Sequence, residues 1–156
     1  MVSINIICVG SLKEKFWKEA TDEYLKRISS FAKINVIEVK EANYGSSENE
    51  ILKAKKEEAE RLEKYKSSYN VALEIKGKNF TSEGFADNIS NLMIKGVSSI
   101  SFFIGGSFGL YDEFSNSLNQ KLSFSNFTFP HQLMRVILLE QIYRAFTIIN
   151  GKTYHK

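Results

Sequence analysis

The last five residues of the chain, Lys152 to Lys156, include two lysines, Tyr154 and His155, the side chains with the most evident chemistry. Ammonium groups bind phosphate, a tyrosine ring stacks on a nucleobase, and an imidazole accepts a proton near neutral pH. A tail of this length often frays in solvent and then has no role. The composition of this tail instead favours contact with RNA and a proton transfer.

A second candidate site is the group of three glycines, Gly105, Gly106 and Gly109, that follows the apolar run 98–104. Their order, G-G-x-x-G, is not the dinucleotide fingerprint G-x-G-x-x-G, and the chain has no G-K-[ST] phosphate loop. A tight turn accounts for one or two of these glycines. Three of them within five residues, at the end of a predicted strand, favour a backbone that approaches a ligand.

The segment 122–133, LSFSNFTFPHQL, allows two interpretations. Its leucine and phenylalanine side chains fit core positions, Ser125–Asn126 fits a turn, and Pro130 fits the start of a helix that His131 caps or anchors in the core. The segment is also rich in backbone donors and small hydroxyl groups between aromatic rings. That composition equally suits an adenine ring held by main-chain hydrogen bonds.

Other classes of site find no support in the sequence. The two histidines and the single cysteine match no zinc-site spacing, so no metal is expected, and no G-x-S-x-G nucleophile motif is present. Cys8 lies in an apolar run, and a lone cysteine excludes an intrachain disulfide and fits a reducing compartment. We find no secretory signal and no apolar run of about 18 residues, so we expect a cytoplasmic protein without membrane contact.

Strand-like and helix-like segments alternate along the chain and must position these candidate groups. Predicted strands cover residues 2–10, 33–40, 70–77, 98–104 and 121–125, and predicted helices cover 12–28, 47–66, 81–96, 111–118 and 131–150. This alternation predicts one α/β domain over residues 1–156, with a mostly parallel sheet and helices on both faces.

The final predicted helix has apolar residues all around its axis. Twelve of the 19 residues from His131 to Ile149 are apolar, and a helix of this kind must be buried on all sides. We therefore predict a homodimer with this helix at the interface. Glu140 and Arg144 lie four residues apart, which favours an ion pair.

The C-terminal part of the chain is basic. Residues 121–156 hold five basic side chains and one acid, a balance of +4, so the other 120 residues sum to −1 within the net charge of +3. An asymmetry of this size is either a chance imbalance on a solvated face or a sign that this end meets a polyanion.

Five segments together resemble a known family: VGSLKEKFW, ALEIKGK, FFIGGSFGL, LSFSNFTFPHQLMRVILLEQIYRAF and the terminal YHK. They resemble the SPOUT-class methyltransferases of the RlmH type, small enzymes that methylate N3 of a pseudouridine in bacterial 23S rRNA. The resemblance spans nearly the whole chain. It implies a C-terminal trefoil knot, S-adenosylmethionine bound in that knot at a dimer interface, and the assembled ribosome as substrate.

The resemblance also implies roles for individual residues. His155 would be the general base or proton relay, Tyr154 would stack on the pseudouridine, and Arg144 would hold phosphate or the base edge. The cofactor would contact Leu73, Gly105, Phe124, Ser125, Asn126, Phe127, Thr128 and Phe129. The RNA would contact His131, Arg135, Lys152 and Lys156.

Three other functions remain open at this stage. The chain could be a SPOUT enzyme that acts on tRNA, with the same cofactor site. It could be a ribosome-binding or assembly module without catalysis. A dinucleotide oxidoreductase is the weakest of the three, because the glycine loop has the wrong order and place.

Overall fold

The computed structural model describes residues 1–156 and contains each predicted strand and helix. The strands are β1 (Ser3–Val9), β2 (Lys33–Val39), β3 (Tyr69–Asn79), β4 (Ser99–Ile104) and β5 (Gln120–Ser123). The helices are α1 (Lys15–Ile28), α2 (Glu48–Glu63), α3 (Ser82–Ile94), α4 (Asp112–Asn116) and α5 (His131–Ile149).

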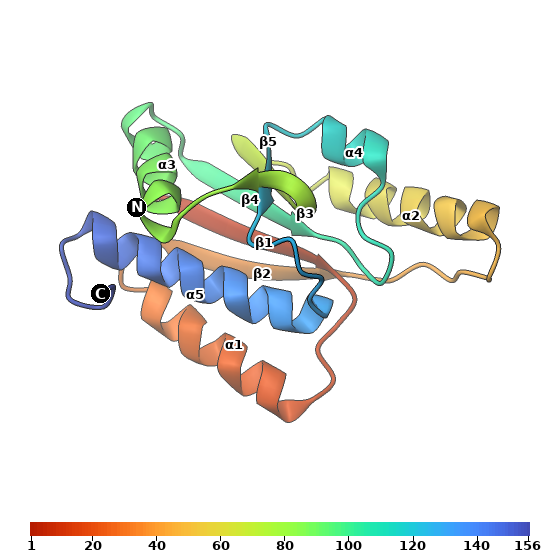
Figure 1. Cartoon of the computed structure of the whole chain (residues 1–156), viewed down its shortest axis with the longest axis horizontal. Coiled ribbons are helices and arrows are strands. Elements are labelled where there is room, and N and C mark those ends of the chain that lie inside the picture. Colours follow the sequence, from red (N-terminus) through yellow and green to blue (C-terminus); the bar gives the residue numbers. More distant parts are fainter.

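The five strands form one sheet in the order β2-β1-β4-β3-β5, and all neighbouring strands are parallel (Figure 1). The carboxyl ends of all the strands therefore meet at one edge of the sheet. Open α/β sheets bind ligands outside this edge. The segments that follow β4 and β5, which contain the glycines and residues 124–129, begin there.

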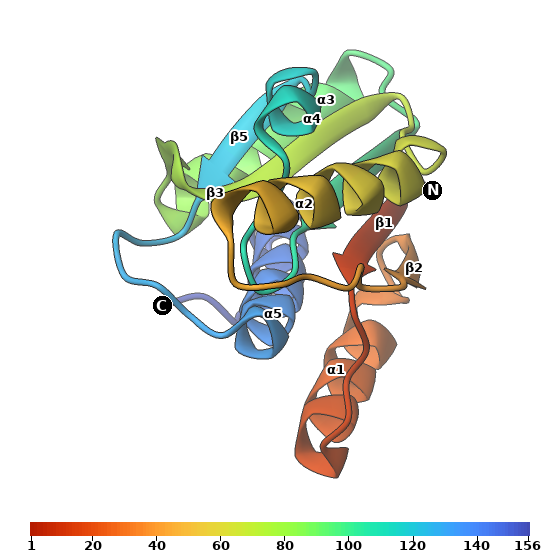
Figure 2. The ribbon, with the colours of Figure 1, turned by 90° about the vertical axis from the view of Figure 1, so that its right-hand side faces the viewer.

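Helices cover both faces of the sheet, as the alternating pattern predicts (Figures 1 and 2). Alternate strand residues, such as Ile6 and Phe102, point into a larger core beneath α1, α3 and α5. The residues between them, such as Ile7 and Phe103, point into a smaller core beneath α2 and α4. This two-sided burial explains the nearly continuous apolar runs in β1 and β4.

Two boundaries differ from the predicted ones. Helix α1 begins at Lys15, because the preceding segment is tied to the sheet and the N–H of Leu12 donates to the carboxylate of Glu38 at 3.2 Å. Strand β3 continues to Asn79 across a register shift between Leu73 and Lys78. The shift brings Gly77 so close to Leu122 that a Cβ at residue 77 would lie 2.7 Å from the Leu122 carbonyl carbon.

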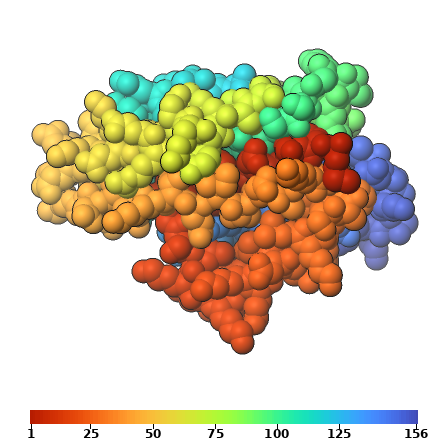
Figure 3. Space-filling view, turned by 180° about the vertical axis from the view of Figure 1, so that it is seen from behind, coloured from red at the N-terminus to blue at the C-terminus, as the bar shows by residue number.

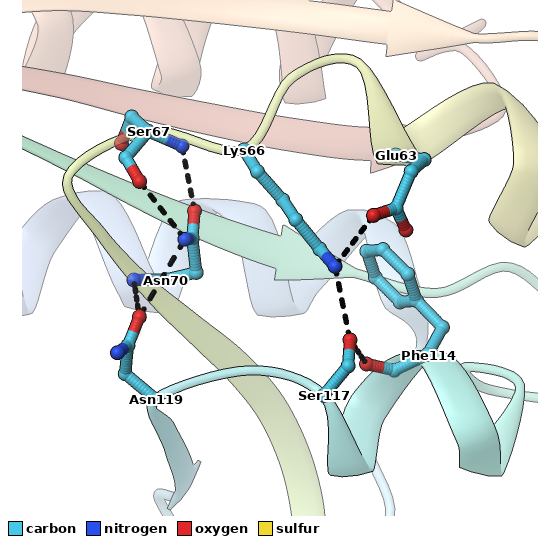
Figure 4. Close-up of polar contacts among 7 residues, drawn as sticks. All are labelled: Glu63, Lys66, Ser67, Asn70, Phe114, Ser117 and Asn119. Carbon is cyan, nitrogen blue, oxygen red and sulfur yellow. Dashed lines mark hydrogen bonds and ion pairs between the residues drawn. The ribbon is translucent and has the colours of Figure 1, made fainter.

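The amino-terminal edge of the sheet is closed by polar side chains (Figure 4). The side chain of Asn119 accepts the N–H of Asn70 at 2.8 Å, and the side chain of Asn70 accepts the N–H of Ser67 at 2.8 Å. Lys66 donates to Ser117 at 3.0 Å and so ties the end of α2 to α4. These contacts fix β5 beside β3, and this edge has a structural role.

Helix α5 is enclosed largely by its own chain, with α1 and α3 beside it and the sheet behind it (Figure 1). Its C-terminal half packs into the larger core through residues such as Leu138, Ile142 and Phe146. Four apolar residues of its N-terminal half are only partly buried and belong to neither core: Leu133, Met134, Val136 and Ile137. None of the helices combines the length and the apolar composition that a membrane span requires.

The N-terminal half of α1 projects beyond the sheet as an arm (Figures 2 and 3). Phe16 at its tip is 61% exposed, and its ring lies 4.9 Å from the ring of Trp17. An exposed phenylalanine beside a half-buried tryptophan on a projecting helix is typical of a protein contact surface.

Candidate functional site

A cavity of about 240 Å³ lies where the segment after β5 meets the start of α3 and the middle of α5. Its walls are mostly apolar, and they carry the hydroxyl and amide groups of Ser82, Ser125 and Gln141. The other lining residues are Phe80, Thr81, Phe85, Leu122, Phe124, Phe129 and Ile137. An apolar cavity with a few polar groups at the carboxyl edge of a parallel sheet is typical of a small-molecule site.

Most backbone polar groups of the segment 124–129 have no partner within the protein. None of these six residues makes a backbone–backbone hydrogen bond. The segment is shaped by two hydroxyl contacts: Ser125 Oγ accepts the N–H of Phe127, and Ser123 Oγ donates to the carbonyl of Ser125, both at 3.0 Å. Because backbone polar groups require partners, this segment suits a ligand that carries both donors and acceptors.

Three of the eight residues expected to bind the cofactor line the cavity: Phe124, Ser125 and Phe129. Asn126, Phe127 and Thr128 are exposed beside it. Leu73 pairs with Leu122 in the sheet at the same edge. Apolar rings and free main-chain groups fit an adenine ring, so the donor set of this cavity fits S-adenosylmethionine.

The glycine loop is explained first by its own geometry. A Cβ on Gly105 would lie 2.7 Å from the backbone nitrogen of Leu110, Gly106 bridges to Gly109, and Gly109 has a φ of +80°. The loop also packs on the segment after β2, where Ser107 donates to Glu41 at 3.0 Å. The loop therefore needs its glycines in order to close, and they do not by themselves indicate a ligand.

The C-terminal tail is docked on the protein through a set of five side chains, here called the tail network: Glu83, Glu140, Arg144, Tyr154 and His155. Arg144 pairs with Glu140 at 2.5 Å, as the spacing predicts. The hydroxyl of Tyr154 donates to the same carboxylate at 3.1 Å, and the guanidinium carbon of Arg144 lies 4.8 Å from the centre of the Tyr154 ring. These contacts hold the tail against α5.

The tail network fixes the tautomer of His155. Arg144 Nη1 lies 3.1 Å from Nδ1 of His155, and Glu83 Oε1 lies 2.6 Å from Nε2. A guanidinium has only donors, so Nδ1 accepts and the ring proton sits on Nε2, from which it is donated to Glu83. This bond lowers the pKa of Glu83 below its ordinary value.

Burial, and then the charge of Glu140, raise the pKa of Tyr154 to about 12, so its hydroxyl is protonated at neutral pH. The hydrogen bond to Glu140 keeps the pKa of Arg144 above its usual value. Both groups are therefore fixed in charge across the physiological range.

Hydrogen bonds connect the tail network to the cavity. Ser82, on the cavity wall, donates to Gln141 at 2.8 Å, and Gln141 donates to Glu140 at 2.8 Å. Glu83, which holds His155, directly follows Ser82 in α3. The start of α3, the middle of α5 and the tail thus form one polar unit beside the cavity.

Of the residues expected to contact RNA, Arg135 is buried and His131 is half-buried. Arg135 is only 1% exposed, and it donates to Glu38 at 2.6 Å and to the carbonyl of Gly10 at 2.7 Å. His131 packs near Gly10, its Nδ1 is buried without a partner, and burial lowers its pKa. Their positions point to support of the β1 end rather than to phosphate contact. Lys152 and Lys156 are exposed.

Sequence reasoning missed Glu83, Ser82 and Gln141. Their only sequence signal is the Thr81 cap, whose side chain accepts the N–H of Gly84 at 2.9 Å and marks the start of α3.

The excess of basic residues in the C-terminal part of the chain is largely compensated within the protein. Arg135, Arg144 and Lys121 pair with acids of this chain. Only Lys152 and Lys156 of that basic set remain unpaired.

Comparison with known proteins decides the family. A family model described as a predicted SPOUT methyltransferase matches residues 2–155. The chain belongs to the SPOUT methyltransferase family. This SPOUT methyltransferase is therefore an enzyme that transfers methyl groups, and the resemblance noted in its sequence is confirmed.

Relatives at about half identity span its full length. Proteins named ribosomal RNA large subunit methyltransferase H are 50% identical in Clostridium novyi, 48% in Clostridium botulinum (strain Kyoto) and 46% in Fusobacterium nucleatum. Each alignment covers 99% of this SPOUT methyltransferase and 100% of the relative. A solved structure described as a probable methylase family protein from Haemophilus influenzae shares the fold, with a TM-score of 0.57 at 12% identity over 98% of this chain and 70% of that one.

Proposed function

We propose that this enzyme uses S-adenosylmethionine to methylate N3 of a pseudouridine in the 23S rRNA of the assembled ribosome, in the cytoplasm. The full-length relatives named ribosomal RNA large subunit methyltransferase H carry this proposal. The cavity at the carboxyl edge of the sheet, with the docked tail beside it, supports it. The pseudouridine and its N3 atom come from the family resemblance of the sequence.

The cofactor would bind at the cavity and along the segment after β5. When bound, S-adenosylmethionine supplies an electrophilic methyl group on a sulfonium sulfur. Phe124 and Phe129 would pack against its adenine ring, and the free main-chain groups of residues 125–128 would hydrogen-bond the ring edge. Leu73, just before the register shift of β3, and Gly105, directly after the neighbouring β4, would complete the edge of the site.

The tail network would prepare the target base. The N3 proton must leave as the methyl group arrives, and Nδ1 of His155 is the basic atom able to take it. In the structure that atom accepts from Arg144, so the proton transfer requires Arg144 to turn toward the RNA, where it would hold phosphate or the base edge. Tyr154 would then be free to stack on the pseudouridine.

We also propose that the enzyme is a homodimer and that its C-terminal segment threads a trefoil knot. The partly buried Leu133, Met134, Val136 and Ile137 and the exposed Phe16 are apolar surface that a second copy would cover. The chain leaves β5 at the sheet edge and returns to α5, which lies between α1 and α3. This path supports the knot.

The decisive experiment measures transfer of a labelled methyl group from S-adenosylmethionine. The substrates are assembled ribosomes, free 23S rRNA and bulk tRNA, all from cells that lack the modification. Label on ribosomes alone, at a pseudouridine N3, is the expected result. Label on tRNA would refute the substrate, and no label on any RNA would favour a ribosome-binding module instead.

His155→Ala tests the proton acceptor. We expect it to abolish methylation while the Kd for S-adenosylmethionine stays unchanged, because the imidazole lies in the tail and does not line the cofactor cavity. Full activity of this variant would exclude His155 as the base.

A further inference from the structure

A second and larger cavity, here called the tail groove, lies on the other side of α5. It has a volume of about 480 Å³ and is formed by the C-terminal half of α1, the C-terminal end of α5 and the tail that turns back between them (Figure 1). A cavity of this volume admits a small molecule or one nucleotide. None of its residues lines the proposed cofactor cavity.

The charge of the tail groove is positive and partly uncompensated. Three cations line it, and its one acid, Glu23, already pairs with Arg27 at 2.9 Å. Lys26 and Lys152, from α1 and from the tail, are exposed and have no ion-pair or hydrogen-bond partner on their ammonium groups. Two unpaired ammonium groups, contributed to one groove by different segments of the chain, suit a phosphate.

The floor of the tail groove is aromatic. Tyr143 lies 6.3 Å from the ring of Phe31 and 4.7 Å from the ring of Tyr154, measured between centroids. The guanidinium carbon of Arg27 is 5.7 Å from the centre of the Tyr143 ring. Aromatic rings beside cations are the combination with which proteins bind unpaired nucleobases and their phosphates.

We propose that the tail groove binds one single-stranded nucleotide of the RNA substrate, next to the nucleotide that is methylated. Lys26 and Lys152 hold its phosphate, and Tyr143 contacts its base. The inference rests on the proposed RNA substrate. It extends that proposal because α1, which contributes nothing to the cofactor cavity, becomes part of the RNA-binding surface.

The tail groove is coupled to the tail network through Tyr154. Tyr154 lines the groove, and its hydroxyl binds Glu140, which also holds Arg144. An RNA strand in the groove therefore contacts the same tail that carries His155. An acidic peptide is the main competing ligand, but the aromatic rings beside the cations favour a nucleobase with its phosphate.

The test compares Lys26→Gln/Lys152→Gln with Lys53→Gln/Lys56→Gln, a control pair of exposed lysines on α2 without ion-pair partners. The probe is a short single-stranded oligoribonucleotide, and its Kd is measured between 0.05 and 0.3 M salt. Loss of the one phosphate that both lysines hold lowers the slope of log K against log salt by about 0.7 and weakens binding about fourfold at 0.15 M. The control pair keeps the wild-type slope.

A second variant tests the base contact. Tyr143→Leu keeps an apolar side chain against the core but removes the ring, and we expect the oligoribonucleotide Kd to rise at least about fivefold. Thermal unfolding shows whether the variant is folded. The Kd for S-adenosylmethionine should be the same in all variants.

Equal salt slopes for both lysine pairs would overturn the tail groove as an RNA site. An acidic peptide that binds the wild type and loses affinity in Lys26→Gln/Lys152→Gln, while RNA binding is unchanged, would overturn it in favour of a protein partner. The proposed function is judged separately, by methylation of ribosomes by the wild type. A failure of the tail-groove proposal therefore cannot be mistaken for a failure of the proposed methylation.

Discussion

The ion pair of the buried Arg135 with the more exposed Glu38 allows a stability prediction. Removing Glu38 should lower the free energy of unfolding more than removing Arg135. The side chain of Arg135 is 1% exposed, whereas that of Glu38 is 41% exposed. Glu38→Ala leaves a buried guanidinium without its counter-charge. Breaking a fully buried pair in this way costs about 3–5 kcal/mol, and the solvent exposure of Glu38 reduces this to about 2–3 kcal/mol.

Arg135→Met removes the buried charge itself. Methionine fills a similar apolar volume, and the exposed carboxylate of Glu38 returns to water, so the main loss is the donor to the carbonyl of Gly10 at 2.7 Å. We expect a cost of about 1 kcal/mol, because well-packed apolar replacements of buried ion pairs are often nearly neutral. The double variant should be as stable as Arg135→Met, since Glu38 then has no buried charge to compensate.

Urea unfolding followed by circular dichroism measures these differences, with Glu60→Ala as an exposed, unpaired control expected to change stability by less than about 0.5 kcal/mol. Glu38→Ala should also lower Tm by about 5–10 °C in a chain of this length. If Arg135→Met proves less stable than Glu38→Ala, the buried charge is not the dominant cost and the reasoning is wrong.

Three further predictions follow from individual sites. Gly105→Ala should destabilise the fold by at least about 2 kcal/mol, because the new Cβ would lie 2.7 Å from the backbone nitrogen of Leu110. Gly106→Ala should lower the unfolding free energy by less in the same urea assay, because its Cβ would meet the Val9 side chain at 3.1 Å. Glu140→Gln should lower the Tyr154 pKa from about 12, while burial keeps it above the ordinary value, in a titration of tyrosinate absorbance; an unchanged pKa would show that Glu140 does not contribute. Burial lowers the pKa of His131 in the folded state. The contribution of His131 to stability is therefore fully present above its unfolded pKa near 6.5 and is lost as pH falls through the folded pKa. His131→Gln should flatten the decline in unfolding free energy between pH 7.5 and 5, and a decline identical to that of the wild type would exclude His131 as the cause.

The cofactor segment illustrates how far local sequence reasoning extends. The composition of residues 124–129 predicts main-chain contacts to a ligand, and the structure leaves most of those backbone groups without an internal partner beside an apolar cavity. The glycine loop illustrates its limit. Three glycines in five residues suggest a ligand, but the close approach of Gly105 to Leu110 is a contact within the loop itself, which composition cannot reveal.

The basic residues at the C-terminal end show the same limit for charge. A count of charges treats Arg135, Arg144 and Lys152 alike, yet the fold buries the first, pairs the second and leaves the third free beside Lys26. The partners responsible, such as Glu38, lie as far as 97 residues away in the sequence. A count of charges therefore does not show which of these side chains are free to meet a polyanion.

The sequence by itself determined the strands and helices, the parallel α/β architecture and the family, because hydrophobic periodicity, caps and glycine positions act over a few residues and the family segments are specific. Only the tertiary structure decided which side chains meet. Glu83 is held against His155 although 72 residues separate them, and α1 is brought beside the tail to form the tail groove. Such contacts depend on how the sheet orders its strands and on where α5 returns across it, and no local pattern encodes that order.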